Sequence, residues 1–182
     1  MGETYPIEEI DLEKFKQYQT EIMEIYMEAG TNGVHEQWLD KAKEEEYMVD
    51  IFRSGGYGYV ALKDGKVIGF TLISPLSHDS LLPDSIKQKF PIDKCLYIAE
   101  MHIHKDYRGK GIGSGMIRKL LGEVDKEKWS YIFVRAWKRN EGAIRLYQRF
   151  GFQLGETIQS VKIKKDRSGT FVIDRQYLWQ RV

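Results

Sequence analysis

The chain has 182 residues, of which 42% are hydrophobic and 13% aromatic, which excludes a disordered polypeptide and suffices for one sizeable core. Its single cysteine, Cys95, excludes an intrachain disulfide framework and favours a reducing compartment, and no apolar run is long enough to span a bilayer. The net charge of +1 hides an asymmetry, because residues 1–53 carry 14 acidic side chains against 5 basic ones, and residues 54–182 carry 13 against 23. We therefore expect one cytoplasmic domain over residues 1–182, without a secretory signal at its start.

Two amphipathic helices are predicted in the acidic first third. Asp11 can cap a helix that runs to about Ala29, and Gly30 to Gly33 break it. A second helix is expected from Glu36 to Phe52, and Ser54-Gly55-Gly56 ends it. The residues expected on the buried stripes are Phe15, Tyr18, Ile22, Ile25 and Ala29 in the first helix and Trp38, Ala42, Val49 and Phe52 in the second.

A hairpin and a central strand are predicted next. Tyr57 to Leu62 and Lys66 to Ser74 alternate as strands around an Asp64-Gly65 turn. Residues 75–94 contain three prolines and are expected to form a long connection, either a lid or a local irregularity, with a short helix starting near Pro83. Cys95 to His104 is apolar on both faces for most of its length, which is typical of a strand in the middle of a sheet.

The last third is predicted to alternate helices and strands. Apolar residues from Ile112 to Val124 mark a helix face, Tyr131 to Trp137 a strand and Glu141 to Phe150 a short helix. A closing hairpin is expected from Gln153 to Lys165 and Thr170 to Gln180. Its aromatic residues serve either core packing or the pairing of two subunits in a homodimer.

The glycine-rich turn from His104 to Ser114 lies between the predicted central strand and the helix that follows. Alternate glycines leave backbone N–H groups unshielded where a helix begins, which is how a chain cradles a phosphate. A Walker loop is excluded because Lys110 is followed by Gly111, and a Rossmann fingerprint is excluded because Ser114 or Met116 stands at the third glycine position. The alternative is a turn without a ligand, but so many glycines at a helix start cost stability.

Two motifs resemble the signatures of the GNAT superfamily of N-acetyltransferases. The first is Arg108-x-x-Gly111-x-Gly113, and the second is Asn140-Glu141-Gly142-Ala143-Ile144-Arg145-Leu146-Tyr147 followed by Phe150-Gly151-Phe152. Lys105 departs from the proline that the family often has there, with no evident consequence. The resemblance implies an α/β (α+β) fold: a mixed, mostly antiparallel sheet of about six or seven strands, flanked by about four helices and splayed at its central strands.

The same resemblance implies acetyl-CoA as co-substrate and no metal. The pyrophosphate would bind the backbone of Arg108, Gly109, Lys110, Gly111, Ile112, Gly113 and Ser114, and Lys110 could reach the 3′-phosphate. Pantetheine would pair with the strand edge at Met101, His102 and Ile103. The second motif would place Asn140, Ala143 and Tyr147 against the cofactor.

Glu100 and Tyr147 are the candidate catalytic residues. A carboxylate on an apolar strand is costly unless it has a use, so Glu100 is either the general base or one half of a structural pair with an Arg or His. His102 and His104 share its face by strand alternation, but two histidines without a third ligand make a metal site a poor interpretation. A tyrosine keeps its proton at neutral pH, so Tyr147 is either the general acid for the departing thiolate or a core aromatic.

The acceptor is the least determined part of the function. The acidic first third favours a small cationic amine, although these acids can equally decorate solvated helix faces. A protein or peptide N-acetyltransferase and a non-catalytic acyl-CoA-binding sensor are the alternatives. A nucleic-acid or membrane partner is not expected, because no clustered Lys and Arg tract is present.

Overall fold

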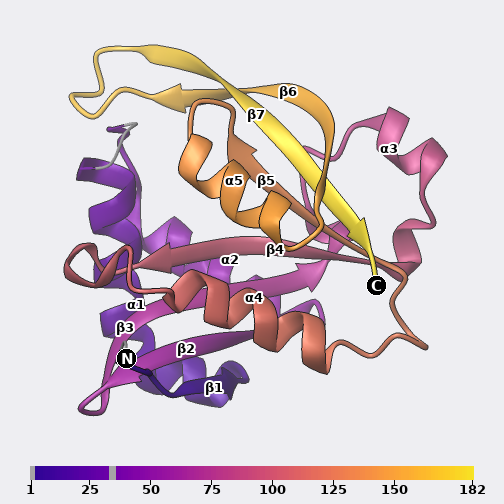
Figure 1. Ribbon diagram of the computed structural model, residues 1–182. Helices are drawn as coiled ribbons and strands as arrows, with labels where there is room; N and C mark the ends of the chain where they lie inside the picture. Colours follow the sequence, from indigo (N-terminus) through magenta and orange to yellow (C-terminus); the bar gives the residue numbers. More distant parts are fainter. Residues whose placement is uncertain (1–2, 33–35) are drawn as a thin grey trace.

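A seven-stranded sheet organises the computed structural model, which describes residues 3–32 and 36–182 (Figure 1). The strand order is β1-β2-β3-β4-β5-β7-β6, and the neighbours are antiparallel except for the parallel pair β4 and β5. The strands are β1 (Ile7–Ile10), β2 (Tyr57–Lys63), β3 (Lys66–Pro75), β4 (Cys95–Ile103), β5 (Tyr131–Trp137), β6 (Gln153–Ile163) and β7 (Thr170–Arg181).

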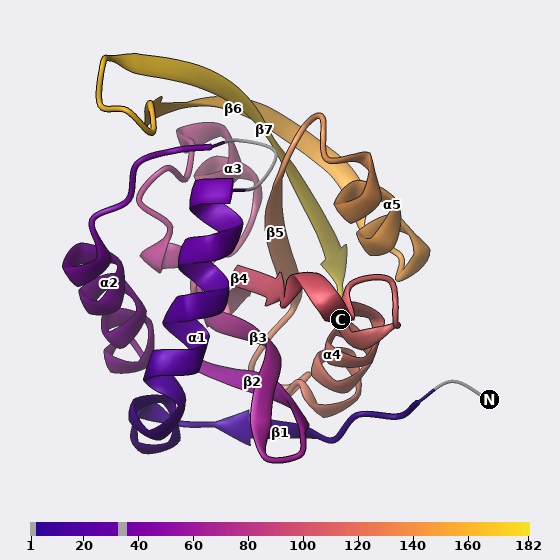
Figure 2. The same cartoon turned by 90° about the vertical axis from the view of Figure 1, so that its left-hand side faces the viewer.

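Helices cover both faces of this sheet. Figure 2 shows α1 and α2 on one side of β2, β3 and β4, and α4 and α5 on the other. The helices are α1 (Leu12–Asn32), α2 (Lys41–Arg53), α3 (Asp84–Lys89), α4 (Ile112–Glu123) and α5 (Glu141–Arg149), with 3₁₀ turns η1 (Leu76–His78), η2 (Ile92–Lys94) and η3 (Lys105–Tyr107). None of the helices in the described ranges is both long and apolar enough to cross a bilayer.

The two helical layers pack separate cores. The first core joins α1 and α2 to β1, β2 and β3, with Phe15, Ile22, Met48 and Phe70 fully buried. The second joins α4 and α5 to the middle of the sheet. This layering gives the mixed, open α/β sheet that the sequence predicts.

The second helix differs from its prediction. Asp40 accepts hydrogen bonds from the N–H groups of Ala42 and Lys43, so α2 begins at Lys41 and not at Glu36. Its buried stripe is Met48, Ile51 and Phe52, and the predicted members Ala42 and Val49 are exposed and half-buried. The predicted member Phe52 is on the observed stripe, and Trp38 lies outside the helix because the cap is four residues later than the assumed start.

Two further elements were not predicted as they occur. Strand β1 is short, and only Ile10 of its four residues is buried. Because Glu8 and Glu9 occupy its middle, the sequence lacks the apolar alternation that would predict a strand. The connection over residues 75–94 is not bare chain, because η1, α3 and η2 anchor it through buried apolar side chains. Helix α1 runs through Gly30 to Asn32, and the rest of the predicted break lies outside the described residues.

The strands β4 and β5 part halfway along their length. They pair only over Cys95 to Ile98 and Tyr131 to Val134, after which β5 bonds to β7 alone. The predicted splay is therefore confirmed, and the β4 edge from Ala99 to Ile103 carries backbone groups that are open toward β5. On its other side β4 contains a bulge, since Ile73 lies opposite Ile98 while Leu72 lies opposite Glu100.

Candidate active site

The glycine turn leads from β4 through η3 into α4. Gly109 and Gly111 have φ values of 75° and 80°, and a side-chain carbon added at either would meet nothing within 4 Å. Gly111 is the N-cap of α4 and offers no side chain, so the first N–H groups of the helix are left bare. An open concave backbone at the positive end of a helix dipole is a binding site for an anion such as pyrophosphate.

The side chains of this turn hold it in place. The Arg108 guanidinium donates from Nε to the carbonyl of Ile103 at 3.1 Å and from Nη2 to Glu28 at 3.3 Å. The Lys110 ammonium lies 5.1 Å from the centre of the Tyr107 ring. Arg108 thus fastens the turn to the end of β4 and to α1.

The second motif forms the start of α5, next to α4. Asn140 caps this helix, because its Oδ1 accepts from the N–H of Ala143 at 3.1 Å. A side-chain carbon on Gly113 would lie 3.4 Å from Leu146, so glycine permits the close approach of the two helices. Both motifs therefore lie on the α4 and α5 side of the sheet, beside the opening between β4 and β5.

Tyr147 is buried on this side of β4. Its hydroxyl lies 3.7 Å from the sulfur of Met101, a β4 residue at the splayed edge. Burial raises the pKa of Tyr147 above its ordinary value, with a contribution from Glu100, so the phenol remains protonated at neutral pH. The residue is a buried core aromatic whose hydroxyl lies at the splayed edge of β4.

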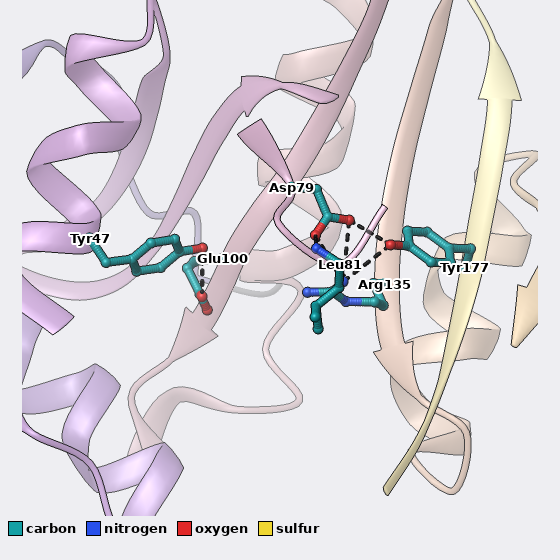
Figure 3. Close-up of polar contacts among 6 residues, drawn as sticks. All are labelled: Tyr47, Asp79, Leu81, Glu100, Arg135 and Tyr177. Carbon is teal, nitrogen blue, oxygen red and sulfur yellow. Dashed lines mark hydrogen bonds and ion pairs between the residues drawn. The ribbon is translucent and has the colours of Figure 1, made fainter. Parts of the chain in front are cut away.

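Glu100 lies on the opposite side of β4. Its carboxylate lies 2.7 Å from His102 Nε2. It also accepts a hydrogen bond from the Tyr47 hydroxyl at 3.3 Å (Figure 3). The β4 bulge explains this position, because strict alternation would put Tyr97 and Glu100 on opposite faces, yet both line one cavity together with Ala99. The side chain is 17% exposed, so it is shielded but accessible.

The two histidines that share the predicted face serve different purposes. The ring of His102 packs against Tyr26 and pairs with Glu100. This is the contact expected if Glu100 is one half of a structural pair with a histidine. His104 instead accepts from the N–H of Asp106 and caps η3. Over residues 3–32 and 36–182, no group of three or more His, Cys, Asp or Glu side chains could hold a metal ion.

The cavity beside Glu100 has a volume of about 310 Å³. It lies between α1 and α2 on one side and the strands β4 to β7 on the other, with the end of β3 and the turn η1 closing it. Sequence reasoning missed most of its charged and tyrosine lining, which is Tyr26, Glu44, Tyr47, Asp79, Arg135, Lys162 and Arg175. These residues come from six separate segments, so no local motif could have indicated them.

A buried ion pair anchors the 75–94 connection at this cavity. Asp79 accepts from Arg135 at 2.9 Å, from the Tyr177 hydroxyl at 2.6 Å and from the N–H of Leu81 at 3.0 Å (Figure 3). The Asp79 side chain is 2% exposed and that of Arg135 11%. Burial alone would lower the pKa of Arg135, but the tyrosines and Asp79 around it outweigh burial and raise it, so the guanidinium is charged.

Comparison with known proteins identifies the architecture. Over 59 residues the chain is 37% identical to the spermine/spermidine N(1)-acetyltransferase of Bacillus subtilis, which covers 32% of this chain and 39% of that enzyme. The structure superposes on an acetyltransferase from Acinetobacter baylyi with a TM-score of 0.74 at 20% identity, covering 98% and 93% of the two chains. It also superposes on YncA from Salmonella typhimurium, solved with its cofactor acetyl-CoA, with a TM-score of 0.70 at 16% identity over 98% and 94%.

A match to a family model covers most of the chain. The model of the acetyltransferase (GNAT) family aligns with residues 19–152, which include the glycine turn, Glu100 and the motif that carries Tyr147. The sequence resemblance, the splayed sheet and this match agree. The chain is a member of the acetyltransferase (GNAT) family, whose activity is acetyl-CoA-dependent N-acetyl transfer.

Proposed function

We propose that this protein transfers the acetyl group of acetyl-CoA to a primary amine by direct attack within a ternary complex, with Glu100 as general base and Tyr147 as general acid. The observation that supports this most is their placement on opposite sides of β4, beside the opening between β4 and β5. Acetyl-CoA would lie with its pyrophosphate on the glycine turn and its pantetheine along the open β4 edge at Met101, His102 and Ile103. The thioester then meets an amine in the Glu100 cavity.

Each proposed group has one step in the transfer. Glu100 takes a proton from the acceptor ammonium, directly or through water, and the amine nitrogen then bonds to the thioester carbonyl carbon. Open backbone N–H groups of β4 stabilise the oxyanion. The carbon–sulfur bond breaks as the carbonyl re-forms, and the Tyr147 hydroxyl protonates the CoA thiolate. The amine loses its second proton to solvent, which gives an N-acetylated amine and CoA.

The acceptor is proposed to be a small amine that is cationic before it reacts. Glu44 and Glu100 provide carboxylates on the α2 and β4 side of the cavity, and the local similarity to a spermine/spermidine acetyltransferase agrees with such a substrate. A peptide amino terminus is the alternative acceptor. We also propose that the protein is cytoplasmic, which cell fractionation would check. We propose further that it is a single domain, which the unfolding experiment in the Discussion would check.

The first test measures CoA release with a panel of amines: spermidine, an aminoglycoside, amino acids and a peptide amino terminus. We expect Glu100→Gln and Tyr147→Phe each to lower kcat/KM by about 100- to 10,000-fold, the usual contribution of a positioned acid or base. Glu46→Gln, on the exposed side of α2, should retain the parent rate. The acid and base assignments are wrong if both variants keep the parent rate, and acetyl-CoA binding without acetylation of any amine would indicate a sensor.

A homodimer remains a prediction. Tyr177 is buried and Trp179 packs against Phe90, so these hairpin aromatics serve the core of the monomer. The large apolar side chains that stay exposed on β6 and β7 are Leu154, Val161, Ile163 and Val172. Light scattering after size-exclusion chromatography would determine the subunit number.

A further inference from the structure

Two cations line the Glu100 cavity without a direct ion-pair partner among the described residues. Lys162 on β6 and Arg175 on β7 both line it, and neither side chain forms a hydrogen bond or ion pair with any residue in the described ranges. Arg135, on the adjacent strand β5, is different because Asp79 and Tyr177 neutralise and bind it. The cavity therefore contains two cationic side chains that bond directly to no described residue, and only the more distant charges of Glu100 and Glu44 act on Lys162.

The same cavity has a surplus of hydrogen-bond donors. Among the described residues, Ser74 Oγ, Arg135 Nε and Arg175 Nε are buried polar atoms without a partner, and all three residues line this cavity. An unsatisfied buried donor costs roughly 1–3 kcal/mol, so native proteins rarely keep several of them in one place without a use. A ligand with several acceptor oxygens would satisfy both these donors and the two cations.

The cost of this arrangement is visible at Lys162. Burial lowers the pKa of its ammonium group, the positive charges of Arg175 and Arg135 lower it further, and the carboxylates of Glu100 and Glu44 offset part of this decrease. Two neighbouring cations in a shielded cavity repel each other unless an anion lies between them. An anionic ligand between them would reduce this repulsion and raise the pKa of Lys162.

The acidic groups lie on the other side of the cavity and already have partners. Glu44 accepts from the Tyr26 hydroxyl at 2.6 Å, and Glu100 is held by Tyr47 and His102. These residues belong to α1, α2 and β4, whereas Lys162 and Arg175 belong to β6 and β7. The cavity is thus divided into an acidic side next to the proposed base and a basic side opposite.

We propose that the acceptor is a small amine that also carries an anionic group, a carboxylate or a phosphonate, which Lys162 and Arg175 bind while the amino group faces Glu100. This inference rests on the N-acetyltransferase function proposed above. It agrees with an ammonium group that enters the acidic side of the cavity. It differs from a polyamine, which would bring a second cation to the basic side.

The test uses matched acceptors that differ only in the anionic group. ω-Amino acids from glycine to 5-aminopentanoate and a set of L-amino acids are each compared with their carboxamides, and an aminoalkylphosphonate and spermidine complete the panel. We expect at least one acid to exceed its amide by about tenfold or more in kcat/KM. Lys162→Met and Arg175→Met should lower kcat/KM for that acid by about tenfold, mainly through KM, and leave the amide within about twofold; tenfold corresponds to one ion pair of about 1.4 kcal/mol.

Controls separate this inference from the function on which it rests. Lys164→Met, one residue past the end of β6 and outside the cavity, should behave as the parent, and thermal unfolding of each variant shows that it is folded. If acids and amides react equally well, or spermidine is preferred to every acid, the anionic acceptor is overturned while acetyl transfer stands. If no amine is acetylated, binding decides: an acid that raises the melting temperature in the parent but not in Arg175→Met supports the anion site, and no such shift for any acid overturns it.

Discussion

Cys95 begins β4 with a fully buried thiol whose sulfur lies 3.1 Å from the carbonyl oxygen of Pro91. Burial, with a contribution from Asp93, raises the pKa of Cys95 to about 12. A raised thiol pKa means that the thiolate is scarce at pH 7 to 9, and the thiolate is the nucleophile. Cys95 is therefore a small buried core residue, and the direct mechanism requires no acetyl-cysteine intermediate.

We therefore expect Cys95 to resist iodoacetamide at pH 8 in the folded protein and to react once urea unfolds it, as intact-mass spectrometry would show. Cys95→Ala should keep the parent kcat and reduce the free energy of unfolding by about 1 kcal/mol, the cost of removing one small buried group. Initial rates should follow a sequential pattern in both proteins. Acetylated Cys95 in a rapid quench with acetyl-CoA alone would contradict the direct mechanism.

At the scale of single elements, the glycine turn is the part that sequence defines best, because its function depends on backbone conformation. Gly111 caps α4 with φ at 80°, where a side chain has space but an L-residue is strained by about 1–2 kcal/mol. Gly122, in the last turn of the same helix, has open space and no such φ. The two glycines therefore make a matched pair with opposite expectations.

Gly111→Ala should lower the free energy of unfolding by about 1–2 kcal/mol and raise the KM for acetyl-CoA by roughly tenfold, because the turn must shift to relieve the strain. Gly122→Ala should be neutral or stabilise by up to about 1 kcal/mol and leave that KM unchanged. Urea unfolding and initial rates measure both effects. If Gly111→Ala is destabilised but its KM for acetyl-CoA is unchanged, the turn does not bind the cofactor.

Elements defined by local pattern were predictable, and those set by tertiary context were not. The strand Tyr131–Trp137 and the cap at Asn140 follow directly from alternation and capping chemistry. The bulge opposite Leu72 and Ile73 contains no glycine or proline that would predict it from the sequence. This bulge is nevertheless the reason that Glu100 faces the cavity. Alternation alone could pair Glu100 with His102 but could not say which helices they would face.

At the scale of the whole molecule, family membership and cofactor came from two local motifs, whereas the acceptor cavity is assembled from both ends of the chain. Tyr47 near the amino terminus and Arg175 near the carboxyl terminus line the same 310 Å³. Charge counted along the sequence suggested a cationic ligand. The folded cavity also contains Lys162 and Arg175 from the basic part of the chain, across from the acidic helices. The charges of the folded cavity therefore favour a ligand that carries both a positive and a negative group.

The continuous sheet predicts how the molecule unfolds. Because β4 and β5 join the α1 and α2 core to the hairpin β6 and β7, we propose that residues 1–182 unfold as one unit. Circular dichroism and tryptophan fluorescence should then give coincident urea transitions, with Trp38 and Trp179 reporting on opposite ends of the chain. Acetyl-CoA at about 100 times its Kd should stabilise by about 2.7 kcal/mol and shift the whole transition upward by roughly 5–10 °C in a thermal scan. Two separated transitions, or a shift confined to one probe, would divide the chain into independent units and place the cofactor on only one of them.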